Sequence, residues 1–254
     1  MFLFDFGEYV TGWQDWVALG VCAVLVGMSK TGIQGINTIV APVLALVFGG
    51  KPSTGLLLPI LCMADLIGVA YYRRHAEWKY ILKLLPAAVV GFFVAIAVDR
   101  FVPDDKFRLL IGGSILISLG AMFWSERGNG RSGQLTSSWW FSPAFGLLGG
   151  FTTMIANAAG PVMGTYLLSM RLPKYAFVGT AAWFFLIVNY LKFPLQIFVW
   201  HNISGKSLLL DVMMLPMIGV GAVIGIRLVR RLPEKGFRNV IIGLTLLSAL
   251  LLFF

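Results

Sequence analysis

The sequence predicts an all-α polytopic membrane protein built from two inverted repeats, each a broken re-entrant helical hairpin plus three spanning helices. The first observation is composition: 58% of the 254 residues are hydrophobic and 12% are charged, whereas a soluble domain has about a quarter charged residues. The second is a series of apolar runs that approach the roughly 20 residues needed to cross a bilayer. The third is a sequence motif that the two halves share.

Eight apolar segments follow one another in two groups of four. They cover 16–48 (broken at 27–35), 54–72, 81–99 and 107–124, and then 139–168 (broken around 150–160), 176–200, 208–226 and 238–254. A polar stretch, SERGNGRSGQLTSS, separates the groups. We therefore expect a first transmembrane repeat at 1–124, a cytoplasmic linker at 125–138 and a second transmembrane repeat at 139–254.

The repeat is visible in the residues themselves. PAAVVGFFVAIAVDRFVPDDKFRLLIGG (86–113) aligns without gaps on PMIGVGAVIGIRLVRRLPEKGFRNVIIG (216–243). The identical pairs include Pro86/Pro216, Gly91/Gly221, Arg100/Arg230, Pro103/Pro233, Phe107/Phe237 and Arg108/Arg238. Shared hydrophobicity alone would not place prolines and arginines in register, so the pattern indicates an internal duplication.

The broken segments decide how the halves are oriented. A continuous helix over 16–48 would be about 50 Å long, too long for a hydrocarbon core of about 30 Å. Folded back at its glycines, each broken segment becomes a re-entrant hairpin, and most Lys and Arg then fall on one side, as the positive-inside rule requires. This arrangement inverts the halves and leaves both termini outside. The alternative is two full crossings by strongly tilted helices.

The distribution of charged residues is typical of a membrane protein and indicates its location and partners. The net charge of +9 comes from Lys and Arg clustered between apolar runs, which indicates topology rather than a nucleic-acid partner. Residues 1–15 contain no Lys or Arg, so we expect the first segment to be retained. The expected location is the bacterial cytoplasmic (inner) membrane, and the expected partners are the lipid bilayer and a small anionic substrate. A homodimer fits a six-span protein, but no isolated interface motif marks one.

The two breaks hold the candidate site. Non-helical backbone at membrane depth is tolerated only where it is buried in protein or lines a polar cavity. In an inverted repeat the two tips meet near the midplane, where free helix N-termini favour an anion. Close helix packing is the alternative role of the glycines. The candidate substrate-binding residues at the breaks are Ser29, Lys30, Thr31, Gln34 and Asn37 in the first half, and Thr152, Thr153 and Asn157 in the second.

Other ionisable residues lie inside apolar runs. Asn189 and Lys192 are three residues apart and share one helix face. Asp65 is either a structural counter-ion for Lys30 or Lys192, or a protonatable group that couples transport to a proton gradient. The alternative for Lys30 is that its side chain snorkels to the membrane interface, which its position near a hairpin tip disfavours. Asp211, near a helix start, is expected to be interfacial.

An enzyme is not expected. His75 and His201 have no partner at metal-ligand spacing, Cys22 and Cys62 lie in apolar runs, and no nucleotide-binding loop is present. We therefore predict no cofactor, no metal and no catalytic residue, so active transport would depend on an ion gradient or an external module.

The stretch KYAFVGTAAWFFLIVNYLKFPLQIF (174–198) resembles the TauE/SafE family, the sulfite exporter-like permeases. Gly179-Thr180, Asn189, Lys192 and Pro194 match its second-half pattern. Ala41-Pro42 and Gly160-Pro161, which end the two broken motifs, fit as well, although many members carry a glycine cluster before each proline. The resemblance implies transport of small sulfur-containing or organic anions such as sulfite, sulfoacetate or other sulfonates, usually by export, and it adds Thr180 to the candidate site.

The sequence thus predicts a secondary transporter of small anions that works by alternating access around a midplane site. Lys30 and Lys192 would neutralise the anion, and the polar residues named above would donate hydrogen bonds to its oxygens. A passive anion channel with the same pore, and a membrane subunit that scaffolds a partner, are the alternatives.

Overall fold

The computed structural model describes residues 9–10, 12–99, 101 and 138–251, and this part of the chain is helical without a strand, as predicted. The predicted segment 107–124 and most of the linker at 125–138 lie outside the described residues. A short 3-10 helix, η1 (Arg73–His75), connects α3 to α4. The helices are α1 (Trp13–Thr31), α2 (Asn37–Phe48), α3 (Gly50–Tyr72), α4 (Trp78–Asp99), α7 (Phe141–Ala156), α8 (Gly160–Ser169), α9 (Lys174–Phe198), α10 (Gly205–Met213), α11 (Leu215–Arg231) and α12 (Glu234–Leu251).

Three helices of the described residues are long and apolar enough to cross a membrane. They cover Pro52–His75, Trp78–Val98 and Lys174–Phe198. α10 and α11 qualify together as a fourth, although they are bent by 48° at their junction. The predicted segment at 208–226 therefore falls on two helices that meet at a bend. The reason is Pro216 in the first turn of α11, because proline is favoured at a helix start and disrupts a helix interior.

The two predicted breaks are present but shorter than expected. α1 continues through Thr31, so the first break covers 32–36 rather than 27–35, and the second covers 157–159 rather than 150–160. Gly35 has a φ of 108° and Asn157 a φ of 54°, in the left-handed region that these two residue types tolerate best. The polar residues 29–31 therefore lie on the last turn of a helix and not in a loop.

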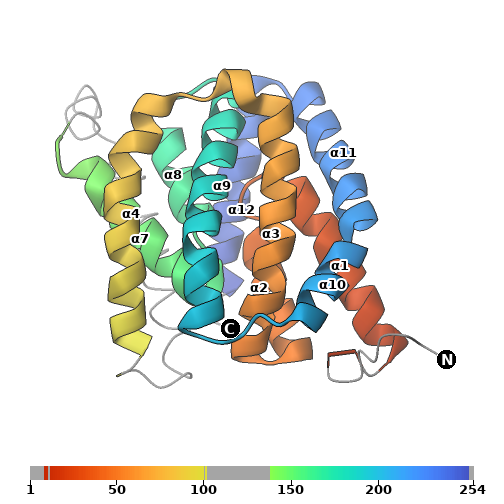
Figure 1. Cartoon of the computed structure of the whole chain (residues 1–254). Helices are drawn as coiled ribbons and strands as arrows, with labels where there is room; N and C mark the ends of the chain where they lie inside the picture. The colour runs from red at the N-terminus through yellow and green to blue at the C-terminus, as the bar shows by residue number, and fades with distance from the viewer. Residues whose placement is uncertain (1–8, 11, 100, 102–137, 252–254) are drawn as a thin grey trace.

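The hairpins enter from opposite edges of the bundle (Figure 1). The turn from α2 into α3 lies at the lower edge of the view, and the turn from α8 into α9 lies at the upper edge. α3 and α9 pack against each other, and they run in opposite directions. Both breaks consequently lie inside the bundle rather than at its rim.

Glycines let the first helix of each hairpin contact a helix of the other half. α1 packs on α11, where Gly221 lies against the backbone of Val24 in α1. α4 packs on α7, where Gly91 lies against the backbone of Leu147 in α7. Gly91 and Gly221 are equivalent positions of the duplicated motif, so the same small-residue contact occurs on both sides of the molecule.

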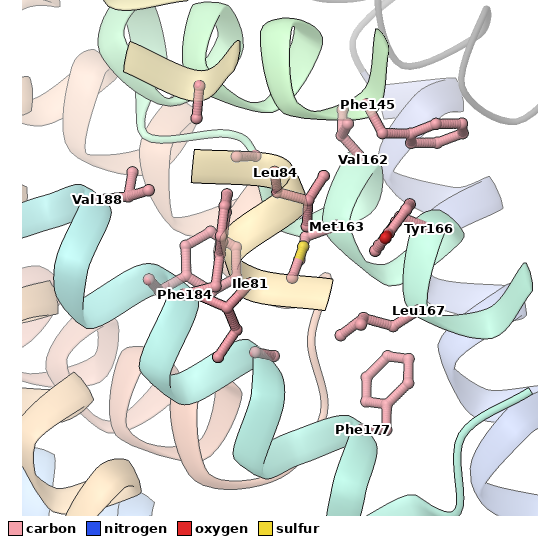
Figure 2. Packing of buried hydrophobic residues seen from close by; sticks show 14 of the residues in the cluster. Ile81, Leu84, Phe145, Val162, Met163, Tyr166, Leu167, Phe177, Phe184 and Val188 are labelled. Atoms are coloured by element: carbon pink, nitrogen blue, oxygen red, sulfur yellow. The ribbon is translucent and has the colours of Figure 1, made fainter. Parts of the chain in front are cut away.

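A buried hydrophobic cluster fixes the second break. α8 is buried along almost its whole length, and its side chains interdigitate with those of α4, α7 and α9 (Figure 2). Tyr166 of α8 is within hydrogen-bonding distance of Ser142 of α7, at 3.0 Å. The labelled members are Ile81, Leu84, Phe145, Val162, Met163, Tyr166, Leu167, Phe177, Phe184 and Val188. Such packing leaves the residues between α7 and α8 little freedom to move.

Gly221→Ala should destabilise the protein, because an added Cβ would overlap the backbone of α1. Overpacking costs about 1–3 kcal/mol, which corresponds to a fall in Tm of about 2–12 °C. Thermal unfolding of the detergent-purified protein measures this. Gly219→Ala, on the same helix with open space at its Cβ, is the control and should not lower the Tm. Equal Tm values for the two variants would contradict the close contact.

Candidate functional site

Both helical breaks open into one small cavity. Its free volume is about 10 Å³, roughly the space that one water molecule requires. Seven of the eleven predicted substrate-binding residues line it, and they come from both halves of the chain. The lining residues are Ser29, Lys30, Gln34, Asn37, Leu61, Thr153, Asn157, Gly160, Phe185 and Asn189. The structure therefore brings the two tips together at one polar site, as the sequence predicts.

A buried ion pair lies at one side of the cavity. The last turn of α1 brings the Lys30 Nζ to 2.9 Å from Asp65 Oδ1 on α3. The second carboxylate oxygen of Asp65 accepts a hydrogen bond of 2.6 Å from Asn189 Nδ2 on α9. The ammonium also lies 4.0 Å from the centre of the Phe185 ring, a cation–π distance. Lys30 is 5% exposed and Asp65 is fully buried, so Lys30 does not snorkel, and Asp65 is its direct counter-ion.

Lys192 makes a different set of contacts. Its Nζ donates to the carbonyl oxygen and to the hydroxyl oxygen of Thr153, each at 2.9 Å, and also to Asn157 Oδ1. These acceptors are neutral and lie at the C-terminal end of α7, where the helix dipole favours a cation. Lys192 is fully buried. It holds the second break in place with a charge that none of these three acceptors neutralises.

The two breaks are also joined directly. Asn37 Nδ2 donates to the carbonyl oxygen of Asn157 at 3.1 Å, and Asn157 Nδ2 donates to the carbonyl oxygen of Thr54 at 3.3 Å. Other polar atoms at the cavity have no hydrogen-bond partner among the described residues: both amide atoms of Gln34, Asn37 Oδ1 and Asn189 Oδ1. Leaving a buried polar group unpaired costs about 1–3 kcal/mol, so these atoms favour a polar occupant.

Four predicted binding residues do not line this cavity: Lys192, described above, and Thr31, Thr152 and Thr180. Thr31 donates to the carbonyl oxygen of Ala222 at 3.0 Å, which ties α1 to α11. Thr152 donates back into α7. Thr180 accepts a hydrogen bond of 2.9 Å from the backbone N–H of Glu77. The hydroxyl groups of Thr31 and Thr180 join separate segments, whereas that of Thr152 bonds within its own helix.

Three cavity residues were not predicted: Leu61, Gly160 and Phe185. Helical spacing could have identified two of them. Phe185 precedes Asn189 by four residues, and Leu61 precedes Asp65 by four residues, so each shares a helix face with a predicted residue.

Asp211, expected near the membrane interface from its place close to a helix start, lies inside the protein. It is fully buried, and neither carboxylate oxygen has a hydrogen-bond partner among the described residues. The bend between α10 and α11 packs α10 against α3, which removes Asp211 from the surface. In the described part of the chain, no three His, Cys, Asp or Glu side chains gather where they could hold a metal ion.

A bundle of apolar helices that encloses a polar, cationic cavity between two helical breaks defines a membrane transport protein. The model of the family Sulfite exporter TauE/SafE matches residues 17–252, nearly the whole chain, so the protein belongs to this family. The resemblance noted at 174–198 is thereby confirmed. The family is one of membrane exporters of sulfur anions rather than of enzymes. Comparisons with curated proteins and with solved structures gave no match.

The Lys30–Asp65 pair predicts strongly non-additive stability effects. Lys30→Met or Asp65→Leu alone leaves a buried charge without its partner and should cost about 3–5 kcal/mol. The double variant removes both charges and should be less destabilised than the sum of the single variants. A double-mutant cycle based on thermal unfolding measures the coupling. Additive losses would show that the two side chains do not interact.

Proposed function

We propose that the protein is a secondary transporter that exports small anions, such as sulfite, sulfoacetate or other sulfonates, across the bacterial inner membrane. The observation that carries this proposal is a pair of buried ammonium groups from opposite halves of the chain: Lys30 lines the polar cavity, and Lys192 lies directly behind its wall, in contact with Thr153 and Asn157. Two such cations in an apolar bundle are costly; Asp65 offsets the charge of Lys30, and an anion in the cavity would offset that of Lys192.

In this proposal the anion occupies the cavity between the two breaks. Its negative charge is attracted to Lys30 and Lys192, while the amide groups of Gln34 and Asn37 and the hydroxyl of Ser29 donate to its oxygens. Thr153 and Asn157, which Lys192 holds, complete the polar wall. Thr31 and Thr180 keep the surrounding helices in place.

The closed state of the cavity favours alternating access over a passive channel. Its free volume of about 10 Å³ is too small for a sulfur oxyanion, so binding requires the helices around the cavity to move apart. We propose that the repeats are inverted, and the opposite entry of the hairpins supports this. The contacts of α1 with α11 and of α4 with α7 make two bodies that could rock against each other. Downhill flux that ignores every imposed ion gradient would favour the channel instead.

Lys30→Gln and Lys192→Gln should each reduce sulfite or sulfonate flux into proteoliposomes by about 10- to 100-fold, because a hydrogen bond to a charged group contributes about 1.5–3 kcal/mol. Lys83→Gln, which removes a charge from the exposed face of α4, is the matched control and should keep normal flux. Normal flux in both cavity variants would contradict the assignment of the site.

The inverted topology predicts which loops face the cytoplasm. In a background that carries Cys22→Ala and Cys62→Ala, Lys206→Cys should react with a membrane-impermeant maleimide in intact cells, because α10 begins on the outer side. Arg74→Cys, in the exposed turn after α3, should react only after permeabilisation. The reverse pattern, or labelling of both sites in intact cells, would refute this orientation.

A further inference from the structure

We propose that the site, once open, binds a monovalent anion without any change in the protonation of its side chains and binds a divalent anion only together with one proton on Asp65. The inference rests on the proposed anion site and concerns the charge of its substrate. It follows from a count of the charged side chains at the site, in which Lys30, Lys192 and Asp65 leave one positive charge in excess.

The excess charge belongs to Lys192. Lys30 lies 2.9 Å from Asp65 Oδ1, so these two groups neutralise each other. Lys192 Nζ has contacts with three neutral oxygens, two from Thr153 and one from Asn157, which match the three N–H bonds of an ammonium group. Hydrogen bonds to neutral groups lower the cost of burying this charge but do not cancel it. One negative charge in the cavity balances the site.

The Asp65 carboxylate would repel a second negative charge on the anion. Lys30 and Asn189 both line the cavity and both contact this carboxylate, so an anion that binds them competes with it. Binding of one proton to Asp65 Oδ1 forms an O–H bond and breaks the ion pair, and Lys30 is then free to face the anion. The total charge returns to zero with a divalent occupant, which a low-dielectric site requires.

Within the described residues, no other positively charged group neutralises the second negative charge in place of this proton. The charged groups that act on Asp65 are Lys30 on α1 and Lys192 on α9, and its titratable neighbours are Cys62 on α3 and Tyr190 on α9. The sequence of α2 contains no ionisable residue.

Two more helices pack against α3. Arg230 of α11 contacts Tyr71, more than one helical turn beyond Asp65. Asp211 of α10 is negative when ionised and could only oppose a second anionic charge.

The test compares two probes with fixed charges. Methanesulfonate is monovalent and sulfate is divalent across neutral and mildly acidic pH, and both present sulfur-bound oxygens. Isothermal titration of the full-length protein in detergent should give a methanesulfonate Kd that is independent of pH. The sulfate Kd should decrease about tenfold for each unit of pH lowered, because one proton binds with each anion. Titrations in buffers of different ionisation enthalpy should show uptake of about one proton per sulfate.

Asp65→Asn removes the carboxylate and keeps an oxygen that can accept from Asn189. Sulfate should then bind at least tenfold more tightly at neutral pH and without pH dependence. Glu77→Gln removes a partly exposed carboxylate and should behave as the wild type does. If Asp65→Asn does not fold, the pH profiles of the wild type still decide the question.

The outcomes separate this inference from the function on which it rests. Binding of both anions with the same pH-independent affinity would overturn the proton requirement for divalent anions and leave the proposed anion site intact. Binding of neither anion would contradict the proposed function, and with it the proton requirement for divalent anions. An Asp65→Asn variant that folds and keeps the wild-type preference would exclude Asp65 as the proton acceptor.

Discussion

The structure depends on one constraint: two helices end inside an apolar bundle, and the polar groups at their ends need partners from the protein. Lys192 provides such a partner at the C-terminal end of α7, where it contacts Thr153 and Asn157. Asn37 then joins the second break to the first. The glycine contacts between the halves and the packed core around α8 hold these partners at short distances.

The sequence predicted most of the fold because its signals are local. The helices at 54–72, 81–99 and 176–200 begin and end within a few residues of α3, α4 and α9, since long apolar runs specify them without help from tertiary contacts. The bend before Pro216 was missed although proline favours a helix start. The first break was placed too early because Gly27 was interpreted as a helix breaker. In the structure Gly27 remains helical and lies against the backbone of α11.

The sequence predicted most of the residues that form the site, but not which of them contact one another. Glycine-rich breaks with polar residues in both halves identified most of the cavity, including Gln34 and Asn157. Which lysine pairs with Asp65 could not be predicted, because both were buried candidates and only the packing of α1 on α3 distinguishes them. Thr31, Thr152 and Thr180 had the right chemistry, but hydrogen bonds to main-chain groups use their hydroxyls.

The central claim is that the cavity between the breaks is the anion site, and an anomalous-diffraction structure with selenate tests it most directly. The account predicts a selenium peak at the cavity, with its oxygens within hydrogen-bonding distance of Lys30 and of the Gln34 or Asn37 amide. The surface groove lined by Arg171, Lys235 and Arg238 provides an internal comparison. Selenium peaks at that groove with an empty cavity would contradict the account.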